Sequence, residues 1–85
     1  MPINISFPKR HKVCVITSFN IKGDIRIDAW GIEFDNKRYK YKVESSTLIE
    51  EVDAYLKFRC LYIESGLLKS INLVFYRKNH RWTTE

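Results

Sequence analysis

Apolar and polar residues alternate with a period of two along most of the chain after residue 12. In the segment 24–29, DIRIDA, three apolar side chains fall on one side and three charged side chains fall on the other. Successive side chains of a β-strand point to opposite faces of a sheet, so this period predicts half-buried strands. Residues that favour turns interrupt the alternation at short intervals, at 20–24, 35–37, 64–66 and 77–80.

The alternation changes phase inside the strand predicted for residues 24–35. Its apolar residues are odd-numbered up to Ala29 and even-numbered from Trp30 to Phe34. A shift of one residue would turn the second set to the wrong face, so the backbone must bulge or bend. Gly31 lies beside the change, and glycine tolerates such a conformation. We therefore expect a strand kinked near Gly31, or two strands that meet at a corner.

Only residues 45–54, SSTLIEEVDA, are ambiguous. Thr47 followed by Glu50 fits a helix-capping box, but a helix here would be too short to stand without packing. We expect an irregular connection with at most one short helical turn around 47–53. The predicted fold is all-β: a small, highly bent antiparallel meander of five to six strands that forms an SH3-like or similar partly closed barrel.

The length of 85 residues allows one domain. Residues 13–85 are predicted to form a single β-barrel-like domain. Residues 1–12 are predicted to be a basic N-terminal arm that could be mobile, because its two prolines lack the N–H that a sheet needs. The chain has neither a signal-peptide pattern nor an apolar stretch as long as a membrane span, so we expect a cytoplasmic protein without a membrane partner.

The chain offers little for catalysis or metal binding. Cys14 and Cys60 lie in apolar surroundings, which favours buried free thiols over a disulfide, although neighbouring strands could still bring the two together. Neither His11 nor His80 is next to a cysteine, and the three glycines are too dispersed to cradle a phosphate. We therefore expect no enzyme activity, no metal and no cofactor.

The segment 37–46, KRYKYKVESS, interleaves aromatic residues with cations. A platform for single-stranded nucleic acid needs rings and cations on the same face, so that bases stack while phosphates are neutralised. On a strand, the alternation sends Tyr39 and Tyr41 to the face opposite the cations. This separation favours core tyrosines beneath a solvated row of positive charge.

A larger basic surface would arise if this strand paired with residues 55–63. Lys40 and Lys42 would then lie beside Lys57 and Arg59, and such close like charges would point to a polyanionic partner. Trp30 either closes one end of the core or anchors an interface. The candidate interaction surface comprises Trp30, Arg38, Lys40, Lys42, Lys57, Arg59, Arg77, Lys78 and Arg81.

The favoured function is a non-catalytic binding module for another macromolecule, with protein preferred as the partner. A homodimer formed through an edge strand is one arrangement that such a module allows. The alternative is a weak, salt-sensitive binder of single-stranded nucleic acid that uses the basic strand face.

The order of these features resembles that of a loosely defined group of short bacterial proteins from low-GC Gram-positive genomes. The similar segments, which cover residues 13–84, are VCVITSF, Gly23, IRIDAWGIEF, YKYKV, FRC, INLVFY and RW. The members of this group have no established activity. The resemblance implies a small β fold and provides no catalytic residue.

Overall fold

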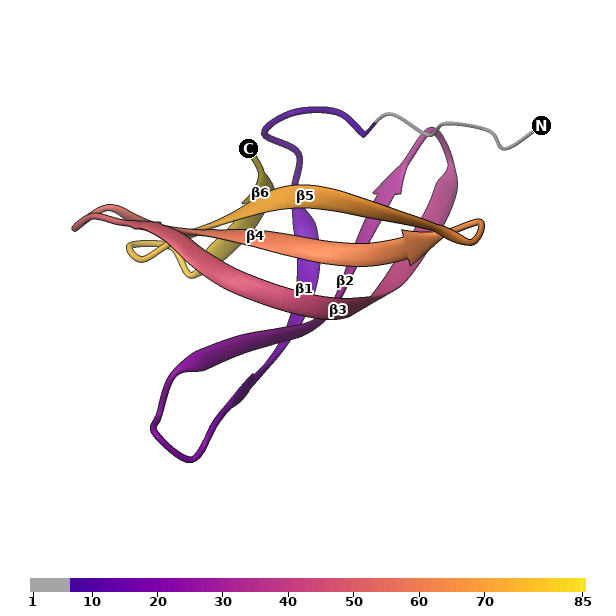
Figure 1. The fold of residues 1–85 in the computed structure, drawn as a ribbon. Helices are drawn as coiled ribbons and strands as arrows, with labels where there is room; N and C mark the ends of the chain where they lie inside the picture. Colours follow the sequence, from indigo (N-terminus) through magenta and orange to yellow (C-terminus); the bar gives the residue numbers. More distant parts are fainter. Residues whose placement is uncertain (1–6) are drawn as a thin grey trace.

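The computed structural model describes residues 7–85, which form six strands and no helix. Each strand pairs antiparallel with the next, and the resulting meander curls by 240° into a half-barrel (Figure 1). The predicted all-β class and partly closed barrel are confirmed. In the described residues no helix could serve as a membrane span. The strands are β1 (Val13–Phe19), β2 (Ile25–Phe34), β3 (Lys37–Glu51), β4 (Tyr55–Glu64), β5 (Leu67–Tyr76) and β6 (Arg81–Thr84).

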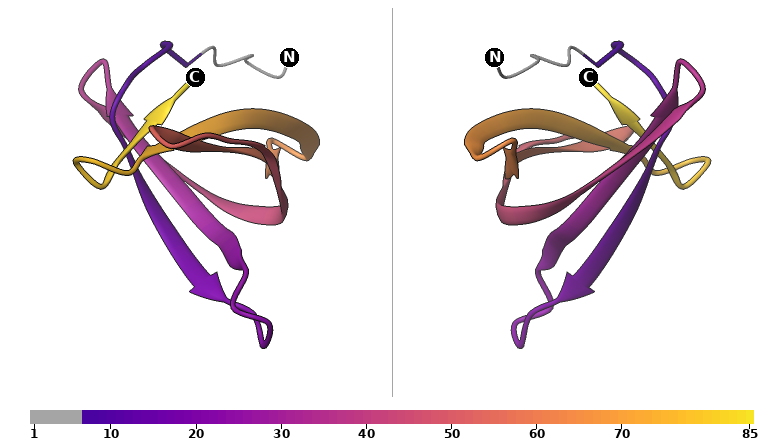
Figure 2. Two further views of the ribbon diagram at one scale, coloured as in Figure 1. Left: turned by 90° about the vertical axis from the view of Figure 1, so that its left-hand side faces the viewer. Right: turned by 90° about the vertical axis from the view of Figure 1, so that its right-hand side faces the viewer.

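The long strand β3 changes partner halfway along its length. Its first part, as far as Lys42, pairs with β2. From Val43 onward it pairs with β4 instead, and its register shifts twice there. Figure 2 shows the consequence: β1 and β2 run at a steep angle to the curled sheet of β3, β4 and β5. The side chains between these two parts of the sheet form the core.

Residues 45–51 correct the expectation of an irregular connection, because they continue β3 as far as Glu51. Thr47 lies opposite Arg59, and Leu48 lies opposite Phe58. Pairing with β4 satisfies main-chain groups that a single helical turn would leave without partners. The capping-box pattern at Thr47 and Glu50 therefore does not form a helical turn, because pairing with β4 is more favourable.

The predicted change of phase in β2 is real, but it lies at Asp28 rather than at Gly31. Ile16 is opposite Ala29, whereas Thr17 is opposite Ile27, so Asp28 is an extra residue in the ladder. This bulge lets odd-numbered Ile27 and even-numbered Trp30 both enter the core.

Two hairpin turns use pairs of residues with positive φ. They are Asp35 (54°) with Asn36 (60°), and Ser65 (52°) with Gly66 (77°). Positive φ at both central positions is typical of type I′ turns, whose twist matches that of the flanking strands. The hairpin tip predicted at 35–37 is confirmed.

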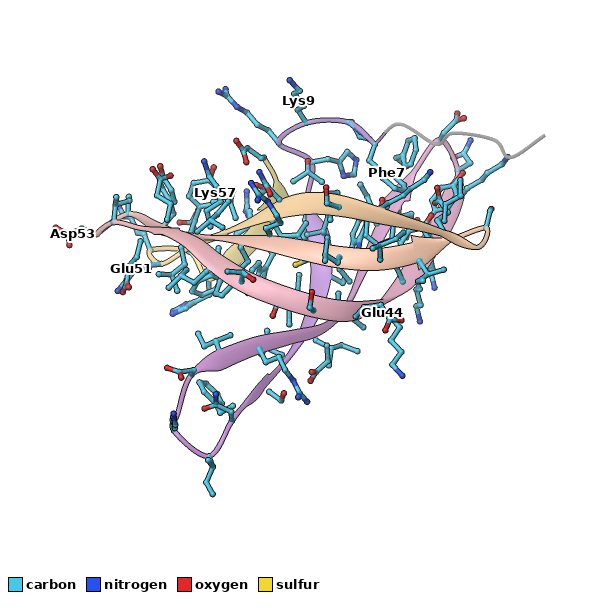
Figure 3. The ribbon with its side chains drawn as sticks, in the orientation of Figure 1. Phe7, Lys9, Glu44, Glu51, Asp53 and Lys57 are labelled. Carbon is cyan, nitrogen blue, oxygen red and sulfur yellow. The ribbon has the colours of Figure 1, made fainter. Side chains whose placement is uncertain are left out.

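Large side chains from distant strands fill the half-barrel. The most deeply buried are Trp30, Ile27, Leu73 and Cys60. Phe7 packs edge-on against four rings of β2 and β3, with ring centroids 5.2 to 5.8 Å away. Figure 3 shows Phe7 on the side of the half-barrel where the β2–β3 hairpin ends. The ring therefore extends the core beyond the sheet.

Of the predicted N-terminal arm, residues 1–6 lie outside the described part of the chain. Residues 8–12 contact the end of β6. The Thr84 hydroxyl donates to the Pro8 carbonyl (2.6 Å), and the Thr84 N–H donates to the His11 carbonyl (2.9 Å). A single bridge between Lys12 and Thr83 then joins the two sides of the half-barrel.

Leu73 and Leu68 provide a matched test of this core, because both lie on β5 with opposite exposure. Leu73 is fully buried, whereas Leu68 is 62% exposed. Leu73→Ala should lower the free energy of unfolding by about 2–5 kcal/mol through the cavity that it leaves. Leu68→Ala should lower it by only about 0.5 kcal/mol. Urea denaturation measures both, and equal losses would contradict this assignment of faces.

Candidate functional site

Within residues 7–85, the outer edge of β1 is free over most of its length. The pairing of β6 on this side is limited to the start of β1, where Thr84 bonds to His11 and Lys12 bridges to Thr83. The His11 carbonyl points toward β6, and main-chain groups alternate in direction along a strand. The N–H and C=O groups of Val15, Thr17 and Phe19 therefore point away from β2. The strand sequence, VCVITSF, contains none of the charged residues that usually protect an edge from pairing. We call Val15–Phe19 the free edge.

The free edge continues into an exposed apolar turn. Phe19 is 71% exposed, and Ile21 is fully exposed. The Asn20 Oδ1 atom accepts hydrogen bonds from the N–H groups of Lys22 and Asp24, each at 2.9 Å, which orders the turn. In Figure 2 this end of the β1–β2 hairpin projects beyond the rest of the sheet. We call Phe19 and Ile21 the apolar tip.

Tyrosines and cations lie on opposite faces of β3, as the alternation predicted. Tyr39 and Tyr41 are half-buried and pack against Phe7, and Tyr41 also packs against Trp30. Lys40 and Lys42 are exposed on the other face. These two rings are therefore core residues and form no stacking platform beside the cations.

The register of β3 against β4 separates the cations that were expected to lie side by side if these two strands paired. Lys57 is opposite Glu50, and their side chains form an ion pair at 3.2 Å. Lys40 and Lys42 instead lie opposite Gly31 and Ala29 of β2. The expected continuous patch is therefore not formed: Arg38, Lys40 and Lys42 lie beside β2, and Lys57 and Arg59 lie farther along the sheet.

The remaining candidates are also dispersed. Trp30 is only 2% exposed, so it belongs to the core and is no surface anchor. Its indole N–H is buried without a hydrogen-bond partner among the described residues. Arg77 pairs with Glu51 at 3.0 Å. Lys78 and Arg81 are exposed at the β5–β6 turn and its exit.

The sequence did not predict that Glu64, at the end of β4, is buried. Glu64 accepts hydrogen bonds from the Tyr41 hydroxyl and the Lys69 ammonium. Burial raises the pKa of Glu64, but these hydrogen bonds and the charge of Lys69 outweigh it and hold that pKa below its usual value. Burial and Glu64 together raise the pKa of Tyr41. The even-numbered residues of β4 from Leu56 onward face the core, and continuing this alternation to Glu64 would have predicted its burial.

The two cysteines differ in exposure. Cys60 is buried as predicted, and burial raises the pKa of its thiol to about 12. The prediction of a buried thiol is wrong for Cys14, which lies exposed on the outer face of β1. Both thiols are free.

The residues from Phe7 to the end contain no cluster of acids, histidines and cysteines that could hold a metal ion. Comparison with known proteins finds no matching family model, no matching curated protein and no matching solved structure. The resemblance to small bacterial β proteins therefore stays a prediction.

The two thiols should differ sharply in reactivity. Cys14 should react with a disulfide reagent in the native protein, because it is exposed. Cys60 should react only after unfolding, because burial disfavours its thiolate. Ellman's reagent applied with and without denaturant measures both reactions. The Cys14→Ser variant is the control: rapid labelling of this variant in the folded state would contradict the burial of Cys60.

Glu64 should make part of the stability depend on pH. Its folded pKa is lowered, so its contribution is present above the ordinary pKa and is lost as the pH falls through the folded value. Glu64→Gln should lower the free energy of unfolding at neutral pH by about 1–3 kcal/mol. The difference from wild type should shrink in acid. Glu44→Gln, at an exposed position of β3 (Figure 3), should change little at either pH. If Glu64→Gln and wild type differed by the same free energy of unfolding at neutral and acid pH, the role of the Glu64 charge would be contradicted.

Proposed function

We propose that this chain is a non-catalytic protein-interaction module that pairs the free edge of β1 with an extended strand of a partner. The observation that carries the proposal is an uncharged strand edge, whose outward main-chain groups are unpaired within the described residues, beside an exposed apolar tip. Adding a strand to such an edge gains main-chain hydrogen bonds, and neighbouring side chains supply selectivity.

The apolar tip supports this function energetically. Full burial of a large apolar side chain stabilises a complex by roughly 1.5–3 kcal/mol, and Phe19 and Ile21 are both largely exposed. A two-stranded hairpin without a further neighbour is marginal in water, so a partner strand would also stabilise the projecting part of β1 and β2.

A second copy of the chain is the partner that best suits this edge. Antiparallel pairing of β1 with its own copy is symmetric and closes at two chains. Since β1 carries no charge, the pairing brings no like charges into direct opposition within the strand. The free thiols of Cys14 and Cys60 suit a reducing cytoplasmic setting for such a dimer.

Binding to single-stranded nucleic acid is supported less well. The cations on β3 and those on β4 are separated, and Tyr39 and Tyr41 pack toward the core. On β3 this leaves phosphate contacts from Arg38, Lys40 and Lys42, without base stacking, to support this function. Such binding would weaken steeply with salt.

Removal of a single main-chain N–H from the free edge tests the proposed pairing. Thr17→Pro deletes this donor, and proline is tolerated on edge strands. Wild-type protein should dimerise in sedimentation equilibrium, whereas Thr17→Pro should associate about tenfold more weakly, which is 1.4 kcal/mol. Thr17→Val retains the N–H and serves as the control.

Circular dichroism should show that all three proteins are folded. A wild-type protein that stays monomeric up to about 1 mM, near −4 kcal/mol of association energy, would refute self-pairing. Equal dimerisation of Thr17→Pro and Thr17→Val would instead show that the dimer uses another surface.

A further inference from the structure

A groove lies on the outer face of the first three strands, beside the free edge, and is lined by side chains, including that of Ile16, whereas the edge offers main-chain groups. Small residues occupy the central strand here: Gly31 is opposite Cys14 and Lys40, and Ala29 is opposite Ile16. Larger side chains on β1 and β3 stand on either side of this low row. The result is a groove of about 610 Å³, within the roughly 300–1,000 Å³ that is typical of small-molecule sites.

The two walls of the groove differ in chemistry. On the β1 side, Cys14 and Ile16 are exposed, and Ile16 keeps 65% of its surface open to solvent. On the β3 side, the Cγ atom of Lys40 lies 3.5 Å from the position that a Cβ atom on Gly31 would take. The start of the lysine stem therefore lies against the floor, and the residue as a whole is exposed to solvent.

The rim charges are predominantly positive. Lys12, Arg38 and Lys40 line the groove, and Glu33 is the single acid among its lining residues. Glu33 already pairs with Arg38 at 3.5 Å. Neither Lys12 nor Lys40 forms an ion pair within residues 7–85. A ligand with a negative group would therefore meet unneutralised ammonium groups.

We infer that this groove binds a single anionic amphiphile, an alkyl chain that ends in a carboxylate. The chain would lie over Ala29 and Gly31 against Ile16, and the carboxylate would contact Lys40. Apolar contact and charge complementarity both act in this arrangement, since the floor is apolar and the free rim charges are cationic. The inference does not depend on pairing at the free edge.

Two features favour a free ligand over nucleic acid. The lining residues Trp30 and Tyr39 direct their rings into the core, which leaves the small imidazole of His11 as the one other aromatic ring of the lining, too little for a platform on which successive bases stack. The floor is also narrow at Gly31, where there is no room for a side chain: a Cβ atom there would lie 3.1 Å from the Tyr39 carbonyl oxygen. Gly31 thus keeps the strands in place and leaves the groove open.

Dodecanoate below its micelle concentration is the probe, and amide NMR spectra of the full chain are the readout. Titration should shift the amide signals of Cys14, Ala29, Gly31 and Lys40. Lys40→Glu should weaken binding by about tenfold, because it replaces an attractive charge with a repulsive one. Lys78→Glu makes the same charge change at the exposed β5–β6 turn and should bind like wild type.

Ala29→Leu should abolish binding by filling the floor of the groove. If this variant does not fold, the comparison of Lys40→Glu with Lys78→Glu still decides, because both positions are exposed. Equal weakening by both charge changes would overturn the proposed head-group site.

Two further titrations complete the test. Dodecyltrimethylammonium, which has the same chain and a positive head, should bind at least tenfold more weakly; equal affinity would overturn the inference. Vesicles of phosphatidylglycerol should give no groove-specific shifts. Binding to vesicles without any response to monomeric dodecanoate would assign this face to a membrane surface and overturn the free-ligand site. The absence of shifts with every probe would also refute it.

Discussion

The transfer of β3 from one partner to another near Val43 determines the shape of the whole molecule. A flat meander of the same strands would keep residues of β2 and β4 far apart. Because β3 turns between them, Trp30 of β2 meets Tyr62 of β4 with ring centroids 5.3 Å apart. Tyr41, on β3 itself, packs against both rings. One bent strand therefore creates the core that a small chain needs in order to fold.

The curl stops short of a closed barrel, and this incompleteness leaves both candidate surfaces on the first strands. Within the described chain, β6 pairs only with the residues that lead into β1, at His11 and Lys12, so most of β1 keeps an open edge. Among residues 7–85 no second layer covers the outer face of β1 and β2, so the small residues Ala29 and Gly31 lie at the bottom of a groove. The edge offers main-chain groups, and the groove offers side chains, so occupation of one leaves the other's groups available.

Two-residue periodicity was sufficient to predict the fold class and the inward tyrosines, and the turn-favouring residues at 35–37 were sufficient to locate a hairpin tip. Periodicity did not place the bulge, because the alternation changes phase after Ala29, beside Gly31, which tolerates a bulge, whereas the extra residue in the ladder is Asp28. Periodicity also could not predict the register between strands. Lys57 lies opposite Glu50 and not beside Lys40, because β3 changes partner, and that change depends on the whole sheet. The exposure of Cys14 depends on a missing second layer, which local pattern does not encode. The free edge and the groove were likewise inaccessible, because both arise from strands that are brought together by the curl.

The Asp28 bulge separates the half-barrel, whose sequence must preserve the core, from the end of the β1–β2 hairpin, whose sequence is free to change. Beyond it, the hairpin from Thr17 to Arg26 keeps its own ordered turn and places Phe19 and Ile21 in solvent. Substitutions at the hairpin end would leave the buried core intact, so selection could reshape this projection without repacking the interior. Mutational tolerance in this chain should therefore be steeply graded along β1 and β2, from the rigid half-barrel outward to the tip.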